Sequence, residues 1–242
     1  MTPKGTQRLL LAGRTIIAVA IAAAVIGQLM TSLTFWTARG DADIALNVLN
    51  FFSFFTIESN LLAMVTLAAL VVLAARRGPL GRGMQVVLLC ATTYMVVTGI
   101  VYNTLLRGIE LPQGATLGWS NEILHLVAPL WMLVDWLLSA RERDVRWRDT
   151  AIVAIYPVAW LAYTMLRGPV TLDQAAGDGT WYPYPFLDPA THANGYAGVV
   201  IMCVVIAVTI VVAAAGLVAI ARARRRSGAA APRVDATVPG LT

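Results

Sequence analysis

The chain has 242 residues, of which 58% are hydrophobic and only 13% are charged, and its formal net charge is +5. Soluble domains carry about 25% charged residues. Together with a mean hydropathy of +0.72, this composition excludes an ordinary soluble domain, a disordered chain and a disulfide scaffold. It predicts an all-α, polytopic membrane protein.

Six apolar runs each come close to the roughly 20 residues that a helix needs to cross the hydrocarbon of a bilayer. In chain order they cover residues 15–35, 46–75, 84–106, 121–138, 150–166 and 196–221. The first run is too long for a signal peptide and ends in Phe35 and Trp36, which make a poor cleavage site. We therefore expect one six-helix transmembrane domain over residues 1–226.

The basic residues predict the orientation of the six spans. Of the 18 Lys and Arg residues, 15 flank the spans on one side and three, Arg39, Arg107 and Arg167, lie on the other side. The positive-inside rule then places both termini in the cytoplasm of a multi-pass cell-membrane protein. The basic excess is explained by topology, and we expect no nucleic-acid partner. Residues 227–242 are rich in Ala, Pro, Gly and Thr, which predicts a disordered cytoplasmic tail.

Cysteine and histidine are too scarce for a metal centre. Cys90 and Cys203 lie inside apolar runs, and His125 and His192 are the only histidines. Because a zinc site needs three or four such ligands, we expect neither a metal nor another cofactor. His192 falls in a loop and is interpreted as a solvated residue.

The longest loop on the non-cytoplasmic side, residues 167–195, carries a run of aromatic residues and prolines. It includes Trp181, Tyr182, Pro183, Tyr184 and Pro185. Prolines restrict the backbone to extended conformations, and Trp and Tyr favour the membrane interface. Two interpretations follow: a lid that covers the outer end of the bundle, or an aromatic belt at the interface.

Polar residues inside the spans are the most informative feature, because unsatisfied polar groups are costly in hydrocarbon and usually face the bundle. In the second span they recur at spacings of three and four, which places them on one helical face: Asn50, Ser53, Thr56 and Asn60. The fourth span has a similar group: Asn121, Glu122, His125 and Pro129. The third span adds Thr98, Tyr102 and Asn103 near its outer end.

Helix geometry places two of these residues at one depth. At 1.5 Å per residue, Thr56 lies about 30 Å from Arg76 and His125 about 24 Å from Arg141, and both helices descend from the outside. Glu58 and Glu122 lie at that level too. Asp135 lies only about 9 Å from Arg141 and is interpreted as a structural partner of cytoplasmic arginines.

A hydroxyl beside an imidazole is the minimum for nucleophilic acyl transfer, because the imidazole takes the hydroxyl proton and later protonates the leaving group. Asn60 or Tyr102 is a candidate oxyanion donor, and a carboxylate such as Glu122 or Glu58 is a candidate to orient the imidazole. The structural alternative is that the threonine bonds its own backbone and the histidine bridges helices. Spacing alone favours this alternative.

The sequence resembles a bacterial family of six-helix membrane proteins called Pr-six-Pr. The resemblance spans nearly the whole chain and rests on residues 55–62, on His125 with Pro129, and on residues 181–188. Thr56 and His125 are also similar to residues of the androgen-induced and androgen-dependent family. Those membrane threonine hydrolases cleave fatty acid esters of hydroxy fatty acids. This second resemblance implies Thr56 as nucleophile and His125 as base. The bacterial family usually has Gln where this chain has Glu58.

Three hypotheses follow. The first is an intramembrane hydrolase of lipid esters, with membrane lipids as its surroundings and a lipid-like substrate. Trp181, Tyr182, Tyr184, Asn103 and Asn121 would support the site. The second is a non-enzymatic lipid- or small-molecule-binding protein or a transporter, in which Glu58, Glu122 and Asp135 relay protons. The absence of an interrupted helix pair counts against transport. The third is a membrane scaffold.

Overall fold

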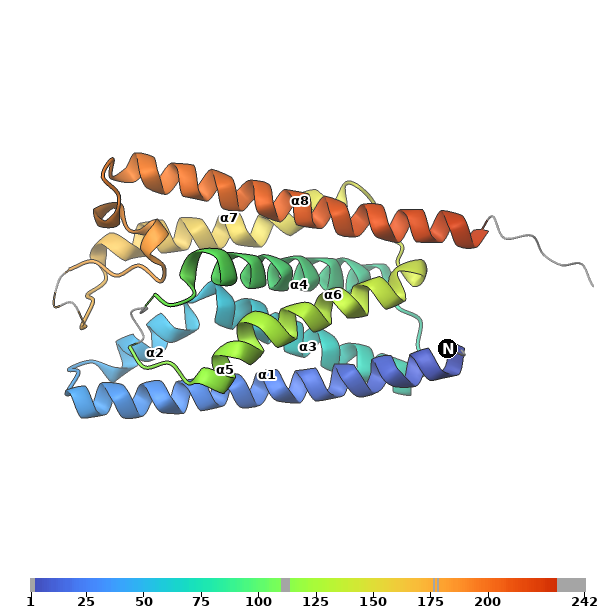
Figure 1. The fold of residues 1–242 in the computed structure, drawn as a ribbon, viewed down its shortest axis with the longest axis horizontal. Helices are drawn as coiled ribbons and strands as arrows, with labels where there is room; N and C mark the ends of the chain where they lie inside the picture. The colour runs from blue at the N-terminus through green and yellow to red at the C-terminus, as the bar shows by residue number, and fades with distance from the viewer. Residues whose placement is uncertain (1–2, 110–113, 176, 178, 230–242) are drawn as a thin grey trace, which may run out of the picture.

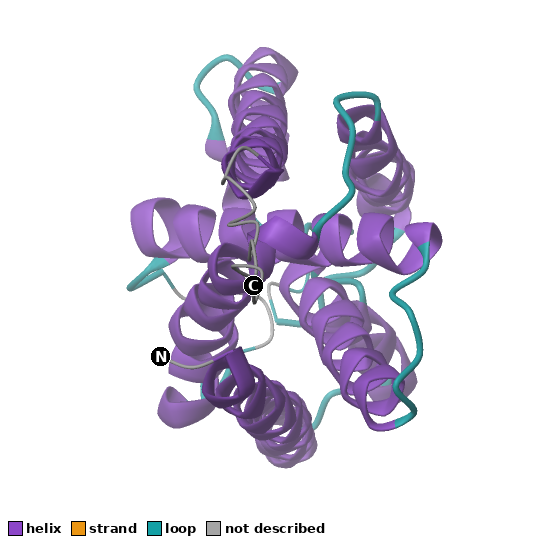
Figure 2. Ribbon diagram, turned by 90° about the vertical axis from the view of Figure 1, so that its right-hand side faces the viewer, coloured by secondary structure: helices purple, strands orange, loops and turns teal. Residues whose placement is uncertain are grey.

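The computed structural model describes residues 3–109, 114–175, 177 and 179–229. Six of its helices are long and apolar enough to cross a membrane, which confirms the all-α class and the number of spans. Figure 2 shows this part of the chain as helices joined by loops. Helix α1 begins and α8 ends at the same end of the bundle (Figure 1). Which side of a membrane this end faces stays a prediction.

Several spans are assembled from more than one helical element. In chain order the elements are α1 (Pro3–Arg39), α2 (Ile44–Phe52), α3 (Phe55–Ala75), α4 (Arg82–Val101), η1 (Tyr102–Leu106), α5 (Gly118–Glu122), η2 (Ile123–Val127), α6 (Ala128–Ser139), η3 (Ala140–Glu142), α7 (Asp149–Arg167), η4 (Gly168–Val170), η5 (Pro185–Leu187), η6 (Pro189–Thr191) and α8 (Tyr196–Ala229). The elements η1 and η2 are π-helical. The others labelled η are short 3₁₀ turns.

Helix α4 is the centre of the bundle. It contacts α3, α6, α7 and α8 and runs between α7 and α8 on one side and α1, α3 and α6 on the other (Figure 1). In its most apolar stretch 61% of the residues are buried, against 17% in α7 and 22% in α8. Helices α7 and α8 therefore leave most of their apolar side chains on the surface, where lipid solvates them.

Two helices extend beyond the expected apolar runs. Helix α1 begins at Pro3, well before the expected residue 15. Helix α8 continues to Ala229, so residues 227–229, which we expected in a disordered tail, are helical. The arginines and alanines that follow the apolar run are good helix formers, and they extend the helix beyond its membrane-spanning part. Residues 230–242 lie outside the described residues.

The second span is not the continuous helix over residues 46–75 that the sequence predicts. Helix α2 ends before Ser53, and Phe54 is extended (φ −71°, ψ 128°) before α3 starts. Side chains from other elements satisfy the two broken ends: Trp160 of α7 donates to the Ser53 carbonyl at 3.0 Å, and Tyr184 accepts from the Thr56 N–H at 3.1 Å. Buried main-chain groups at such a break need partners from the protein, because water does not reach them. The break lies just before Phe55, where the apolar span Phe55–Ala75 begins. The expected polar stripe is buried throughout but is divided between α2 and α3.

At the opposite end of the bundle, Asp135 is fully buried and pairs with Arg14, whose Nε lies 2.6 Å from the carboxylate. Arg143 approaches the same carboxylate at 3.8 Å and donates to Ser139 Oγ at 2.6 Å. The predicted pairing of Asp135 with arginines at this end of the bundle is confirmed.

The aromatic loop packs on the other end of the bundle. Trp181, Tyr182 and Tyr184 are each no more than 5% exposed. Tyr184 and Trp181 pack edge-on against Phe54, with ring centroids 5.5 and 5.8 Å apart. A belt residue would present its ring to lipid, so the burial of these three side chains contradicts the belt interpretation and agrees with a cover over the bundle.

Candidate functional site

Irregular backbone is concentrated at the end of the bundle that carries the predicted site. The break before α3 supplies Thr56, η1 supplies Tyr102, and η2 supplies His125. Elements η1 and η2 contact each other, and η2 also contacts α3. Single-turn π segments inside α-helices frequently mark functional sites, so the backbone itself points to this region.

Pro129 explains the π segment around His125. In an α-helix, residue 129 would donate to the His125 carbonyl, but proline has no N–H and its ring clashes with that carbonyl. The chain instead forms an i−5 bond from Ala128 N to the Ile123 carbonyl. Gly99 of α4 lets this segment approach closely, since a Cβ there would lie 3.0 Å from the Pro129 Cβ.

Two asparagine side chains satisfy the carbonyls that the π segment leaves free. Asn103 Nδ2 donates to the His125 carbonyl at 3.0 Å, and Asn60 Nδ2 donates to the Leu124 carbonyl at 3.1 Å. Asn60 also donates to the Thr56 carbonyl at 2.8 Å. Both hydrogens of its amide are thus bonded to main-chain oxygens. In this conformation Asn60 joins α3 to η2, and it has no hydrogen left for the oxyanion role that we considered.

His125 is buried and held in one tautomer. Its Nδ1 lies 2.9 Å from the Asn121 carbonyl. A carbonyl oxygen only accepts, so Nδ1 carries the hydrogen and Nε2 keeps its lone pair. The Tyr102 ring stacks on the imidazole, with centroids 3.7 Å apart and planes at 24°. Asn121 Nδ2 donates to the Tyr102 hydroxyl at 2.6 Å, so the same residue fixes both rings.

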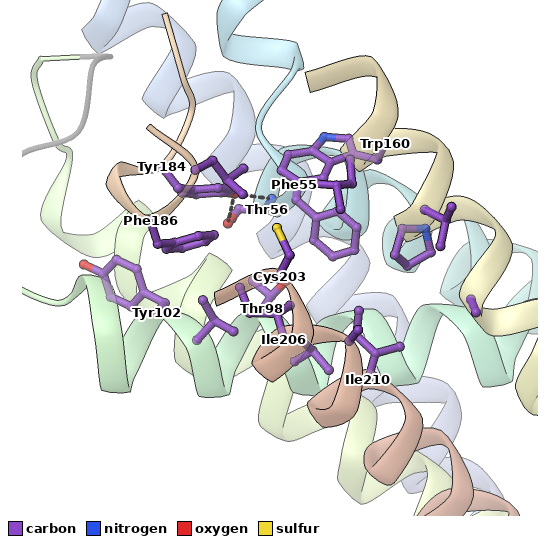
Figure 3. A pocket seen from close by; sticks show the side chains of 18 of the residues that line it. Phe55, Thr56, Thr98, Tyr102, Trp160, Tyr184, Phe186, Cys203, Ile206 and Ile210 are labelled. Atoms are coloured by element: carbon purple, nitrogen blue, oxygen red, sulfur yellow. Dashed lines mark hydrogen bonds between the residues drawn. The ribbon is translucent and has the colours of Figure 1, made fainter. Parts of the chain in front are cut away.

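Thr56 lies in the first turn of α3, where main-chain N–H groups have no partner within the helix. The Tyr184 hydroxyl fills this position: it accepts from Thr56 N at 3.1 Å and lies 3.3 Å from Thr56 Oγ1 (Figure 3). Burial raises the pKa of Tyr184 to about 12, so the phenol stays protonated at neutral pH. A hydroxyl at a helix N-terminus marks a place where a partially negative oxygen is stabilised.

Thr56 lines two cavities. The larger, of about 160 Å³, is almost entirely apolar (Figure 3). Its lining side chains with polar atoms are Thr56, Thr98, Tyr102, Tyr184 and Trp160, and Cys203 adds a thiol. It reaches the lipid-facing surface between α7 and α8, because its lining residues Val158 and Val211 are 64% and 52% exposed. The smaller, of about 40 Å³, contains His125, Asn121 and Gln28. Thr56 therefore stands between an apolar chamber and a smaller cavity in which polar side chains, His125 among them, are mixed with apolar ones.

The carboxylates predicted to orient the imidazole do not contact it. Glu122 pairs with Arg107 at 2.7 Å, which raises the pKa of that guanidinium. Glu58 accepts from Tyr156 at 2.5 Å. The Asn121 carbonyl orients His125 in their place. The role that we considered for Glu122 and Glu58 is wrong for this conformation.

Thr56 and His125 both line the smaller cavity, but the hydrogen-bond partner of Thr56 Oγ1 in this conformation is Tyr184. Asn103, Asn121 and Tyr102 belong to the same cluster as His125. Trp181 packs against Phe54, and neither Trp181 nor Tyr182 lines the larger cavity. Sequence reasoning missed Phe55, Trp160 and Cys203 as lining residues, because an apolar side chain in a span carries no signal of whether it faces lipid or a cavity.

Within the described residues, no group of three or more His, Cys, Asp and Glu side chains is placed to hold a metal ion. Comparisons with known proteins add no relative: no protein-family model, curated protein or solved structure significantly matches the chain. The two family resemblances of the sequence stay predictions.

Proposed function

We propose that this protein hydrolyses esters of fatty acids inside the membrane, with Thr56 as nucleophile and His125 as general base. The observation that carries the proposal is the position of Thr56 between an apolar chamber and a smaller cavity whose lining includes the polar side chains of His125 and Asn121. An ester needs this division, because its acyl chain is apolar while hydrolysis requires water. A cavity of about 40 Å³ has room for a water molecule.

In the proposed reaction, Thr56 Oγ1 rotates from Tyr184 toward His125. Nε2 takes the hydroxyl proton as Oγ1 attacks the ester carbonyl carbon. The oxyanion receives hydrogen bonds from the Thr56 N–H and the Tyr184 hydroxyl, the two groups now bonded to each other. The imidazolium then returns its proton to the leaving alcohol. Water, activated by the same imidazole, attacks the acyl-threonine and releases the fatty acid and the free hydroxyl.

Substrate access follows from the shape of the larger chamber. An ester dissolved in the bilayer would enter laterally between α7 and α8, where the chamber reaches the surface, and loop residues 184–187 would close the chamber at the bundle end. With the orientation that the basic residues predict, both termini are cytoplasmic and the ester enters from the outer leaflet of the cell membrane.

The test is hydrolysis of p-nitrophenyl butyrate, octanoate and dodecanoate by the purified protein in an uncharged detergent. Because a general base contributes about 10²–10⁴-fold, Thr56→Ala and His125→Ala should each lower turnover at least a hundredfold, while Thr56→Ser keeps measurable activity. Thr66→Ala is the matched control, since Thr66 is a buried threonine lower on the same helix. Turnover that persists in both alanine variants would exclude the mechanism.

A specific observation also favours the second hypothesis, a non-enzymatic lipid-binding protein or transporter. The interruption between α2 and α3 makes one discontinuous helix, and discontinuous helices form the binding sites of many transporters. The sequence argument against transport, which rests on the absence of an interrupted helix pair, is therefore weaker. A protein that retains a long-chain ester in the chamber without turnover, equally in wild type and Thr56→Ala, would favour binding over hydrolysis.

A further inference from the structure

A third cavity lies on another side of α3, away from the proposed hydrolytic chamber. It is a crevice of about 430 Å³ between α3, α4 and α7. Three aromatic rings separate the crevice from the chamber. Phe55 lines the chamber, while Tyr94 and Tyr156 line the crevice. The centroids of the three rings are 5.7 to 6.0 Å apart. Val87, Ile152 and Ile155 line the crevice and remain 38%, 43% and 66% exposed, so the crevice opens to lipid.

One carboxylate stands in this apolar crevice. Glu58 is half-buried, and its Oε2 accepts from the Tyr156 hydroxyl at 2.5 Å. None of the ion pairs recorded among the described residues includes Glu58. An ionisable group at membrane depth normally has a partner. Here the hydrogen bond from Tyr156 leaves the second carboxylate oxygen free to meet a ligand.

The residues that line the crevice are spread along the helices, with the carboxylate of Glu58 at one end. Glu58 lies 17 residues above the end of α3, about 26 Å by helix rise, so it stands near one edge of a hydrocarbon layer about 30 Å thick. Helix α4 runs antiparallel to α3 and lines the crevice from Tyr94 down to Val86, a length of about 12 Å. A membrane amphiphile has the same arrangement, with its head at the edge of the layer and its tail toward the middle.

We propose that this crevice binds an amphiphile with an ammonium head group, which pairs with Glu58 while its alkyl tail follows the crevice toward Val86. The cation is favoured over a neutral head for two reasons. It supplies the missing counter-ion of Glu58. It also lies beside the rings of Tyr94 and Tyr156, whose centroids are 5.7 Å apart, and aromatic faces attract ammonium groups.

The experiment measures binding of dodecylamine and of dodecanol, which has the same tail and no charge, by native mass spectrometry in an uncharged detergent. Wild type should bind dodecylamine roughly ten- to a hundredfold more tightly than dodecanol, the range expected for a hydrogen bond to a charged group. Glu58→Gln should abolish that preference, and Tyr156→Phe should alter it less. Glu122→Gln is the matched control, because it removes the same charge from a carboxylate paired with Arg107.

The result that overturns the proposal is a wild type that binds amine and alcohol equally, which can be read without any variant. A preference for the amine that survives Glu58→Gln overturns it too. The site does not depend on ester hydrolysis. Thr56→Ala should bind dodecylamine like wild type, so failure of the hydrolytic mechanism and failure of this site are observed separately.

Discussion

Substitution of Tyr184 by Phe is the sharpest test of how the broken second span is held. The change removes one oxygen, which accepts from Thr56 N at 3.1 Å and lies 3.3 Å from Thr56 Oγ1. It keeps the ring, which packs against Phe54 and Phe186 with centroids 5.5 and 5.2 Å apart. Any loss of stability therefore comes from the hydrogen bonds and not from packing.

The magnitude follows from what is left unpaired. A buried donor without a partner costs about 1–3 kcal/mol, and removal of a helix N-terminal cap costs about 0.5–2 kcal/mol. We expect Tyr184→Phe to lower the free energy of unfolding by about 1–2 kcal/mol. For a chain of this size that lowers the melting temperature by roughly 2–8 °C.

The assay is thermal unfolding in detergent, followed by intrinsic fluorescence. Tyr182→Phe is the matched control: Tyr182 lies two residues away, is equally buried at 5% exposed, and makes no recorded hydrogen bond to α3. A melting temperature of Tyr184→Phe within 1 °C of wild type, or an equal drop in Tyr182→Phe, would refute the claim that this hydroxyl caps α3.

Three further predictions concern positions away from Tyr184. Gly99→Ala should destabilise the fold by about 1–3 kcal/mol in the same melting assay, because the added methyl would lie 3.0 Å from a proline of α6. The control Gly216→Ala should not destabilise it, since a methyl there meets no neighbour within 4 Å. Asp135→Ala should cost about 3–5 kcal/mol by leaving buried arginine without its counter-ion, and Asp144→Asn, from an exposed ion pair, less than about 1 kcal/mol. Hydrogen bonds from Arg39 lower the pKa of Asp41. The contribution of Asp41 to stability should therefore be complete above about pH 4, the pKa of the unfolded state, and should vanish as the pH falls through the lower pKa of the folded state. In denaturant titrations at stepped pH, Asp41→Asn should lack this acid-dependent loss.

The six spans could be predicted because a bilayer imposes one simple requirement, a run of about 20 apolar residues. The burial of Asn50, Ser53, Thr56 and Asn60 followed from the cost of exposing polar groups to lipid. The break before α3 could not be predicted in this way. Each residue from 50 to 56 is compatible with a helix, and the groups that satisfy the broken ends come from residues 160 and 184.

The π segment at His125 is an intermediate case. Pro129 is visible in the sequence, and it removes the donor to the His125 carbonyl. The sequence does not show which group donates to that carbonyl in place of the missing N–H. Asn103 of η1 bonds that carbonyl, and Gly99, one turn earlier, lets the two segments approach. The carboxylates do not take the predicted role in this conformation for a related reason, since they bond to Arg107 and Tyr156, which lie in other elements.

A continuous helix would serve equally well to cross a membrane, and it would do so without exposed main-chain groups. Within a regular helix every N–H beyond the first turn is bonded to a carbonyl, so Thr56 inside one continuous helix over residues 46–75 would have no N–H to offer a ligand. The break before α3 changes this, because it places Thr56 in a first turn at the start of the apolar span Phe55–Ala75 and directs its N–H to the Tyr184 hydroxyl. Under the proposed hydrolysis, the same N–H serves the oxyanion. A variant in which α2 and α3 form one continuous helix should then lose turnover and keep the fold. This outcome separates a chemical role of the break from a structural one.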